Sequence, residues 1–131
     1  MQLVIDIAAT PHPYLSPNRS SRLPKMAHAR EAQKARTRAR IETEKLQSHE
    51  WWPTWSRWVH LNQEFRLEWM VAWEKGHKRV DEDNLIAMLK PYQDGVADAL
   101  GINDRAFIPT IHSQLRDPAG TGWMRLVITP L

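Results

Sequence analysis

The stretch Phe65–Glu74, FRLEWMVAWE, alternates between two sets of side chains at every step. The larger apolar residues occupy one set of positions, and the arginine and the glutamates occupy the other. Alternation of this kind is typical of a strand with one buried face. Gly76 ends the pattern. The stretch therefore predicts a half-buried strand, and it commits the chain to a fold that contains a sheet.

Three further strands are expected on either side of this one. Residues 1–7, MQLVIDI, alternate in the same way, and Phe107–Gln114 and Trp123–Thr129 also have strand-like patterns. The segment between the last two, Asp117–Gly122, is rich in turn residues and predicts a hairpin loop. The three prolines of TPHPYLSPN, residues 10–18, predict an extended loop after the first strand.

Two main helices are predicted. The first covers residues 24–47, which are rich in Ala, Arg, Glu and Lys, and its thin alanine face allows close packing but little burial. The second begins at Asp83 or Asn84, both good N-caps, and stops at Gly101, with a kink expected at Pro91. The apolar residues with helical spacing in the second helix are Leu85, Met88, Leu89, Tyr92, Val96 and Leu100.

This order of elements predicts one α/β (α+β) domain over residues 1–131, with a mixed sheet of about four strands and two main helices. A composition of 42% apolar and 25% charged residues is that of a soluble globular protein. No apolar run approaches the length of a membrane span, and a secretion signal is absent, so a cytoplasmic protein without a membrane partner is expected. The lack of cysteine excludes disulfides, zinc–thiolate sites and thiol catalysis.

Positive charge is concentrated in the basic helical segment, residues 19–47. Between Arg19 and Arg40 there are eight Lys or Arg residues and a single acid, Glu31, although the whole chain has a net charge of only +3. Such a segment beside a net acidic remainder favours a polyanionic partner. A solvated helix face explains the charge pattern equally well, and the two interpretations stay open.

The chain also carries a tryptophan cluster. Trp51, Trp52, Trp55 and Trp58 are four of its seven tryptophans. Exposed rings could stack on bases. Burial in the core or in a subunit interface is the favoured interpretation, because large aromatic rings dominate such contacts.

Asp81, Glu82 and Asp83 place three acids side by side in an otherwise basic stretch. Helix capping explains one of them, not three. Further along, Lys90, Asp94 and Asp98 share a face with Asp83 at helical spacing, which as a solvated stripe would hold a Lys90–Asp94 pair. If Asp104 folds back, then Asp81, Asp83 and Asp104 form a pocket of three carboxylates. Such a pocket would need Mg²⁺ or Mn²⁺, and with a nearby lysine it suits phosphodiester hydrolysis.

These motifs resemble the RusA family of Holliday junction resolvases. The resemblance is carried by Asp81-x-Asp83-Asn84-Leu85, by the helix with Lys90 and Asp94-Gly95, and by Leu100–Asp104; it is strongest over residues 79–104. It implies a homodimeric, Mg²⁺-dependent endonuclease, of phage or bacterial origin, that cuts four-way DNA junctions. The implied metal ligands are Asp81, Asp83 and Asp104, and the implied catalytic lysine is Lys90, with Asp94 as a second candidate acid and Asn84 as a residue that orders the loop.

Two departures from the family are visible, and two other classes of function compete with it. The interval from Asp83 to Lys90 is longer by about one helical turn, and Asn103 stands where the family often has an aspartate. A non-catalytic nucleic-acid-binding protein, including a degenerate RusA relative, and a structural or interaction protein are the alternatives. His77 is either a surface histidine or a phosphate contact. The residues expected to contact DNA are Arg30, Lys34, Arg36, Arg38, Arg40, Lys78 and Arg79.

Overall fold

The computed structural model describes residues 2–17, 24–61 and 64–131. In these ranges four strands form one mixed sheet, as the sequence predicts, and three α-helices accompany it. Within these residues, no helix combines the length and the apolar character that a membrane span requires. The strands are β1 (Leu3–Ile7), β2 (Phe65–Trp73), β3 (Phe107–Arg116) and β4 (Trp123–Pro130), and the α-helices are α2 (Lys25–Glu44), α3 (Trp52–Leu61) and α4 (Glu82–Leu100).

The strand order is β1-β4-β2-β3, with β2 antiparallel to β4 and parallel to β3. The predicted hairpin between β3 and β4 is therefore wrong, because β2 lies between them. The loop at residues 117–122 instead crosses the end of β2, where Asp117 N–H donates to the Trp73 carbonyl at 3.0 Å. The Asp117 carboxylate accepts backbone hydrogen bonds from Ala119, Thr121 and Gly122, which holds this crossing loop closed.

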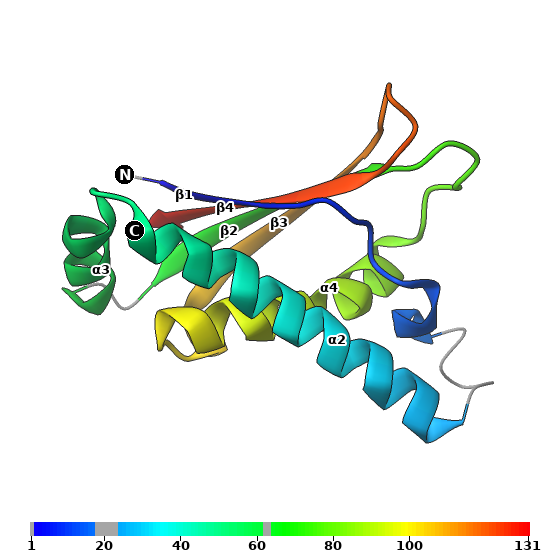
Figure 1. Cartoon of the computed structure of the whole chain (residues 1–131). Coiled ribbons are helices and arrows are strands. Elements are labelled where there is room, and N and C mark those ends of the chain that lie inside the picture. Colours follow the sequence, from blue (N-terminus) through cyan, green and yellow to red (C-terminus); the bar gives the residue numbers. More distant parts are fainter. Residues whose placement is uncertain (1, 18–23, 62–63) are drawn as a thin grey trace.

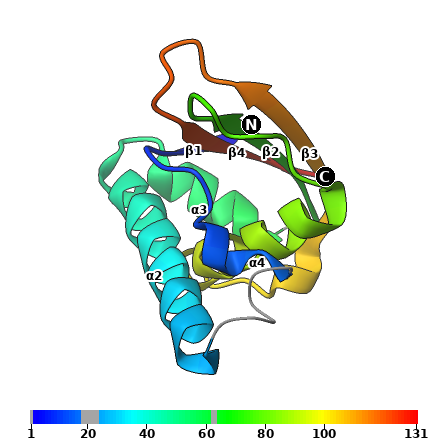
Figure 2. The ribbon, with the colours of Figure 1, turned by 90° about the vertical axis from the view of Figure 1, so that its right-hand side faces the viewer.

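α2 and α4 pack side by side against one face of the sheet, and the other face carries no helix in the described part of the chain (Figures 1 and 2). The alternation predicted for β2 is confirmed, because its odd-numbered side chains face the helices and are buried. The helical stripe predicted for α4 is buried as well. The core is thus a single layer between the sheet and two helices. Its central members are Leu67, Trp69, Val71, Leu85, Leu89, Val96 and Leu126.

The ends of α4 differ in part from the prediction. The N-cap is Asp81, not Asp83 or Asn84, because the Leu85 N–H donates to the Asp81 carbonyl at 2.9 Å and so includes Glu82 in the first turn. Gly101 ends the helix with a φ of 69°, as expected. Pro91 lies inside one continuous helix. Asp81 therefore caps the helix, and Glu82 and Asp83 lie in its first turn.

α3 is a helix that the sequence pattern did not predict. It contains Pro53 in its first turn, where the missing N–H has no helical partner in any case. The expected burial of the tryptophan cluster is confirmed for Trp55, which is fully buried, whereas Trp51 and Trp58 remain 42% and 37% exposed. Only part of this cluster therefore belongs to the core.

α2 and α4 cross closely at Gly95. A Cβ at this position would lie 2.1 Å from the carbonyl oxygen of Arg36 and 3.1 Å from the Cβ of Ala39. On α2, the buried contacts come mainly from Ala35 and Ala39, which is the thin alanine face that the sequence indicates. The absence of a side chain at Gly95 therefore sets the separation of the two helices.

Replacing Gly95 with alanine is expected to destabilise the protein by about 1–3 kcal/mol, because the added methyl group would force α2 and α4 apart. The sign is informative, since alanine within a helix otherwise stabilises by about 1 kcal/mol relative to glycine. Urea unfolding followed by circular dichroism measures the change. Gly101→Ala is the control. A Cβ there meets nothing within 4 Å, so any loss of stability in that variant comes from the φ of 69° and not from a steric clash. A more stable Gly95→Ala variant would contradict the close crossing.

Candidate functional site

The acids at the start of α4 are exposed. Asp81 occupies the N-cap position without a side-chain capping bond, and Glu82 and Asp83 lie in the first turn. No ion pair of Asp81 or Asp83 is found among the described residues. The positive end of the helix dipole favours their negative charge, but it neutralises them only in part. Two carboxylates are therefore available to a cation from outside the chain.

Asp104 does fold back onto α4, but it meets the helix at Lys90. The Lys90 ammonium is paired with Asp104 and with Asp94, the latter at 2.8 Å. Asp83 and Lys90 are seven residues apart, which corresponds to about 10 Å along a helix axis. In residues 2–17, 24–61 and 64–131, no three or more histidine, aspartate or glutamate side chains are arranged to hold one metal ion. The expected pocket of Asp81, Asp83 and Asp104 is thus not assembled here.

The pairing around Lys90 affects both partners. Burial alone would lower the pKa of Lys90, but hydrogen bonds to Asp104 and Asp94 outweigh it and raise the pKa. The pKa of Asp104 is lowered, first by its hydrogen bond to Lys90 and then by the charge of Lys90. Lys90 is therefore held as a cation and is unsuited to act as a general base at neutral pH.

A surface pocket of about 320 Å³ surrounds this ion pair between α2 and α4. Arg36 enters it from α2 and binds Asp98 in a bidentate manner, with contacts of 2.6 and 2.8 Å. Asn103 lies at its edge, where Oδ1 accepts a hydrogen bond from the Arg105 N–H at 2.9 Å and caps the short helix η3 (Asp104–Ala106). Asn84 is half-buried in α4, away from this pocket's lining. The pocket's charges are thus satisfied within the protein.

The basic helix α2 is also largely neutralised by its own neighbours. Within α2, Lys34 pairs with Glu31 at 3.2 Å, and Arg38 pairs with Glu42 at 3.2 Å. Arg30 is exposed and forms no such pair, and Arg19 and Arg22 lie outside the described residues. The remaining two expected DNA contacts on this helix, Arg36 and Arg40, face Asp98 and Glu44.

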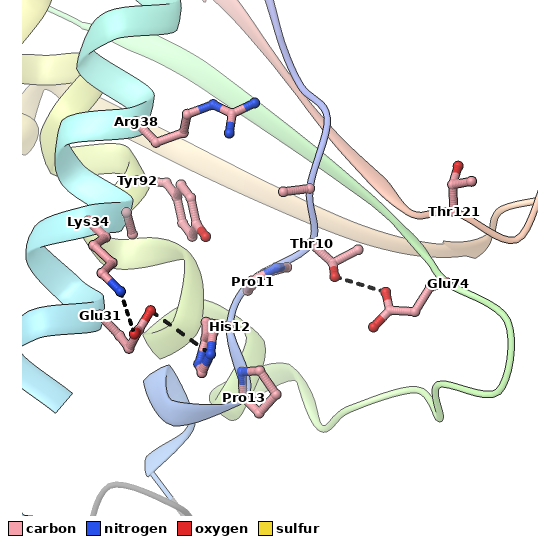
Figure 3. Close-up of a pocket in the computed structure, with 12 residues that line it drawn as sticks. Thr10, Pro11, His12, Pro13, Glu31, Lys34, Arg38, Glu74, Tyr92 and Thr121 are labelled. Atoms are coloured by element: carbon pink, nitrogen blue, oxygen red, sulfur yellow. Dashed lines mark hydrogen bonds and ion pairs between the residues drawn. The ribbon is translucent and has the colours of Figure 1, made fainter. Parts of the chain in front are cut away.

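Lys34 and Arg38 line a second pocket, of about 500 Å³, between α2 and the N-terminal loop (Figure 3). His12 lies 4.0 Å from Glu31 in this pocket, and the Thr10 hydroxyl donates to Glu74 at 2.8 Å. These carboxylates face the pocket together with the cations, so its charge is mixed. It therefore shows no preference for an anion.

Gln114 holds the backbone that leads into the acids at the start of α4, and the sequence pattern assigned it no role. Its Oε1 accepts from the Trp73 indole at 2.8 Å and from the Val80 N–H at 3.0 Å, while its Nε2 donates to the Val80 carbonyl at 2.8 Å. Val80 immediately precedes Asp81, so Gln114 anchors the start of α4 to β3. The feature that could have identified Gln114 is its polar side chain, which is paired with Val71 on the face of the sheet that the helices cover.

Comparison with known proteins assigns no family. No protein-family model matches the chain. A stretch of 61 residues is 43% identical to an uncharacterized protein of Xylella fastidiosa (strain Temecula1), and it covers 44% of this chain and 40% of that protein. The match thus spans less than half of the relative's length. Function must therefore be argued from the site.

Replacing Lys90 with glutamine is expected to raise the pKa of Asp104 toward that of an ordinary aspartate, because Lys90 is the main cause of its lowering. Carboxyl-carbon NMR titration measures this change. The pKa of Asp98 is lowered mainly by Arg36, and it should not change. Identical Asp104 titration in both proteins would mean that the pair does not form in solution.

The same pair contributes to acid stability with a defined sign. Because the pKa of Asp104 is lower in the folded state, its contribution is present above the unfolded-state pKa and is lost as the pH falls through the folded-state value. The Lys90→Gln variant should show a smaller loss of stability over this acidic range.

Proposed function

We propose that this chain is a magnesium-dependent endonuclease that cuts branched DNA, in the manner of the RusA family that its sequence resembles. The observation that carries the proposal is the pair Asp81 and Asp83, two exposed carboxylates at the N-cap and in the first turn of α4 that form no ion pair with a described residue. Other acids near the two main helices, among them Glu31, Asp94, Asp98 and Asp104, are paired with cations. The acids at the helix start are available to a metal ion.

The donor set fits magnesium. Mg²⁺ keeps several waters and commonly binds through one or two carboxylates together with phosphate oxygens of the substrate. Asp81 and Asp83 would supply the two carboxylates, a DNA phosphate would supply a further oxygen, and water molecules would complete the set of ligands. When bound, the ion would supply Lewis acidity and a water molecule of lowered pKa.

The side chains around the acids would perform the other tasks. Lys90 lies on the face of α4 that also carries Asp83, so its ammonium would face the DNA strand that reaches the acids. Asp94 and Asp104, which pair with Lys90 in this structure, would hold the ammonium in place, so Asp104 would be a positioning residue that acts through Lys90. Gln114 would fix the backbone that carries Asp81.

The RusA resemblance supports a more specific substrate and assembly. A four-way junction has two strands of like polarity that can be cut symmetrically, and two copies of one active site related by a two-fold axis match that symmetry. We therefore extend the proposal to a homodimer that acts on four-way junctions in a bacterial or phage-infected cytoplasm. The extension stands on the sequence motif alone.

A non-catalytic nucleic-acid-binding protein is the second candidate. The observation that favours it is that Asp104 lies with Lys90 and not with Asp81 and Asp83, so three carboxylates are not gathered. This candidate predicts salt-dependent DNA binding without cutting. Metal-dependent strand cleavage separates the two functions.

Asp83→Asn is expected to abolish cutting of a four-way junction in Mg²⁺ while junction binding is retained, because the amide removes one metal-binding charge without changing size. Gel analysis of a junction labelled on each strand, with Mg²⁺ or EDTA, measures nicking. Glu82→Gln is the matched control, since it removes the same charge from the same turn and should continue to cut. Equal nicking by the Asp83→Asn protein and the wild type would overturn the site, and absence of wild-type nicking with Mg²⁺ and Mn²⁺ would favour the second candidate.

A further inference from the structure

Unpaired positive charge gathers at the end of β2 and β3, away from the basic helix. Among the described residues, Lys75, Lys78, Arg79 and Arg116 take part in no ion pair. They lie in the segment that follows β2 and at the last residue of β3, beside the start of α4 (Figure 1). By contrast, four cations of α2 are each paired with a carboxylate. Lys25 and Arg30 are the cations of α2 that stay unpaired among the described residues, so much of the unpaired positive charge lies at this end of the sheet.

Both arginines of this group, Arg79 and Arg116, line a pocket of about 180 Å³. Its walls contain no carboxylate and consist of Trp73, His77, Arg79, Gln114, Leu115 and Arg116. Each of the other pockets described above contains carboxylates that offset its cations. The lining of this pocket therefore favours an anion.

The pocket is also rigid on one side. The His77 ring lies flat on the Trp73 indole, with centroids 4.0 Å apart and an angle of 4° between the planes. The His77 Nδ1 is 2.6 Å from the Lys78 carbonyl oxygen, and because a carbonyl oxygen can only accept, Nδ1 donates this hydrogen bond. Gln114 binds Trp73 and the Val80 backbone at once. A bound anion would thus meet one fixed wall, formed by Trp73, His77 and Gln114.

We propose that this pocket binds a backbone phosphate of DNA, with Arg79 and Arg116 as its principal ligands. Guanidinium groups present paired N–H donors that match phosphate oxygens, which favours a phosphate over a simple halide. Arg79 is two residues from Asp81, and Gln114 fixes the chain between them. The phosphate would therefore belong to the strand that reaches the acids, and this inference rests on the proposed function for its choice of DNA.

The arginines of α2 differ from Arg79 and Arg116 in that several of them are paired with carboxylates. A phosphate that approaches Arg36 or Arg38 meets a guanidinium whose charge is offset by Asp98 or Glu42, whereas Arg116 pairs with no carboxylate among the described residues. Exposed ion pairs are weak, so α2 still attracts DNA at long range. The close phosphate contacts are nevertheless expected at Arg79 and Arg116.

The test measures binding separately from cutting. Fluorescence anisotropy with a labelled four-way DNA junction is recorded in EDTA for the wild type, Arg116→Gln and Arg79→Gln. Each variant is expected to bind about tenfold more weakly, with the slope of log K against log salt reduced by about one. Arg57→Gln is the matched control, because Arg57 is an exposed arginine without an ion pair on α3, at the opposite end of β2. Its affinity should stay close to that of the wild type.

Further measurements make each outcome decisive. Thermal unfolding establishes that the variants fold, and Arg116→Lys should restore only part of the affinity, because it keeps the charge but loses the paired donors. Wild-type affinity and salt slope in both Arg116→Gln and Arg79→Gln would overturn the pocket, as would the absence of DNA binding by the wild type. If the wild type binds through Arg116 but does not nick DNA in Mg²⁺, the pocket stands and the nuclease proposal fails.

Discussion

The close crossing of α2 and α4 at Gly95 is the constraint on which the rest of the structure depends. Because the backbone of Arg36 occupies the space where a side chain would project from Gly95, both helices lie in one layer against the sheet. This places the apolar stripe of α4 under β2 and brings Arg36 to Asp98. The burial available to α2 is small, since its contacts are mainly alanines, so the short distance between the helices compensates for the lack of large side chains.

The same packing determines which charges remain available. Once α2 lies beside α4, its basic residues find carboxylates on both helices and lose much of their net field. Among the described residues, the charges left without an ion pair include two carboxylates at the start of α4 and a group of cations at the adjacent end of the sheet. A divalent cation and a phosphate are complementary to these two groups. The proposed endonuclease and the proposed phosphate pocket use this single arrangement of charge.

Periodicity in the sequence was sufficient for most of the individual elements. The alternation of Phe65–Glu74 and the helical stripe from Leu85 to Leu100 depend on the period of each element, which is a local property. α3 was not predicted, because its segment is short and contains Pro53, and because its closely spaced tryptophans obscure the helical period. α4 begins at Glu82, earlier than predicted, because several adjacent residues at this point can serve equally well as the N-cap.

What the sequence by itself determined was the type of each main element, the buried faces of β2 and α4, and the placement of Lys90, Asp94 and Asp98 on one face of a helix. Only the tertiary structure decided that β2 separates β3 from β4, that Asp104 joins Lys90, and that Gln114 holds Val80. The reason is physical: strand neighbours and ion-pair partners are selected by packing between distant segments. Local periodicity contains no information about those distances.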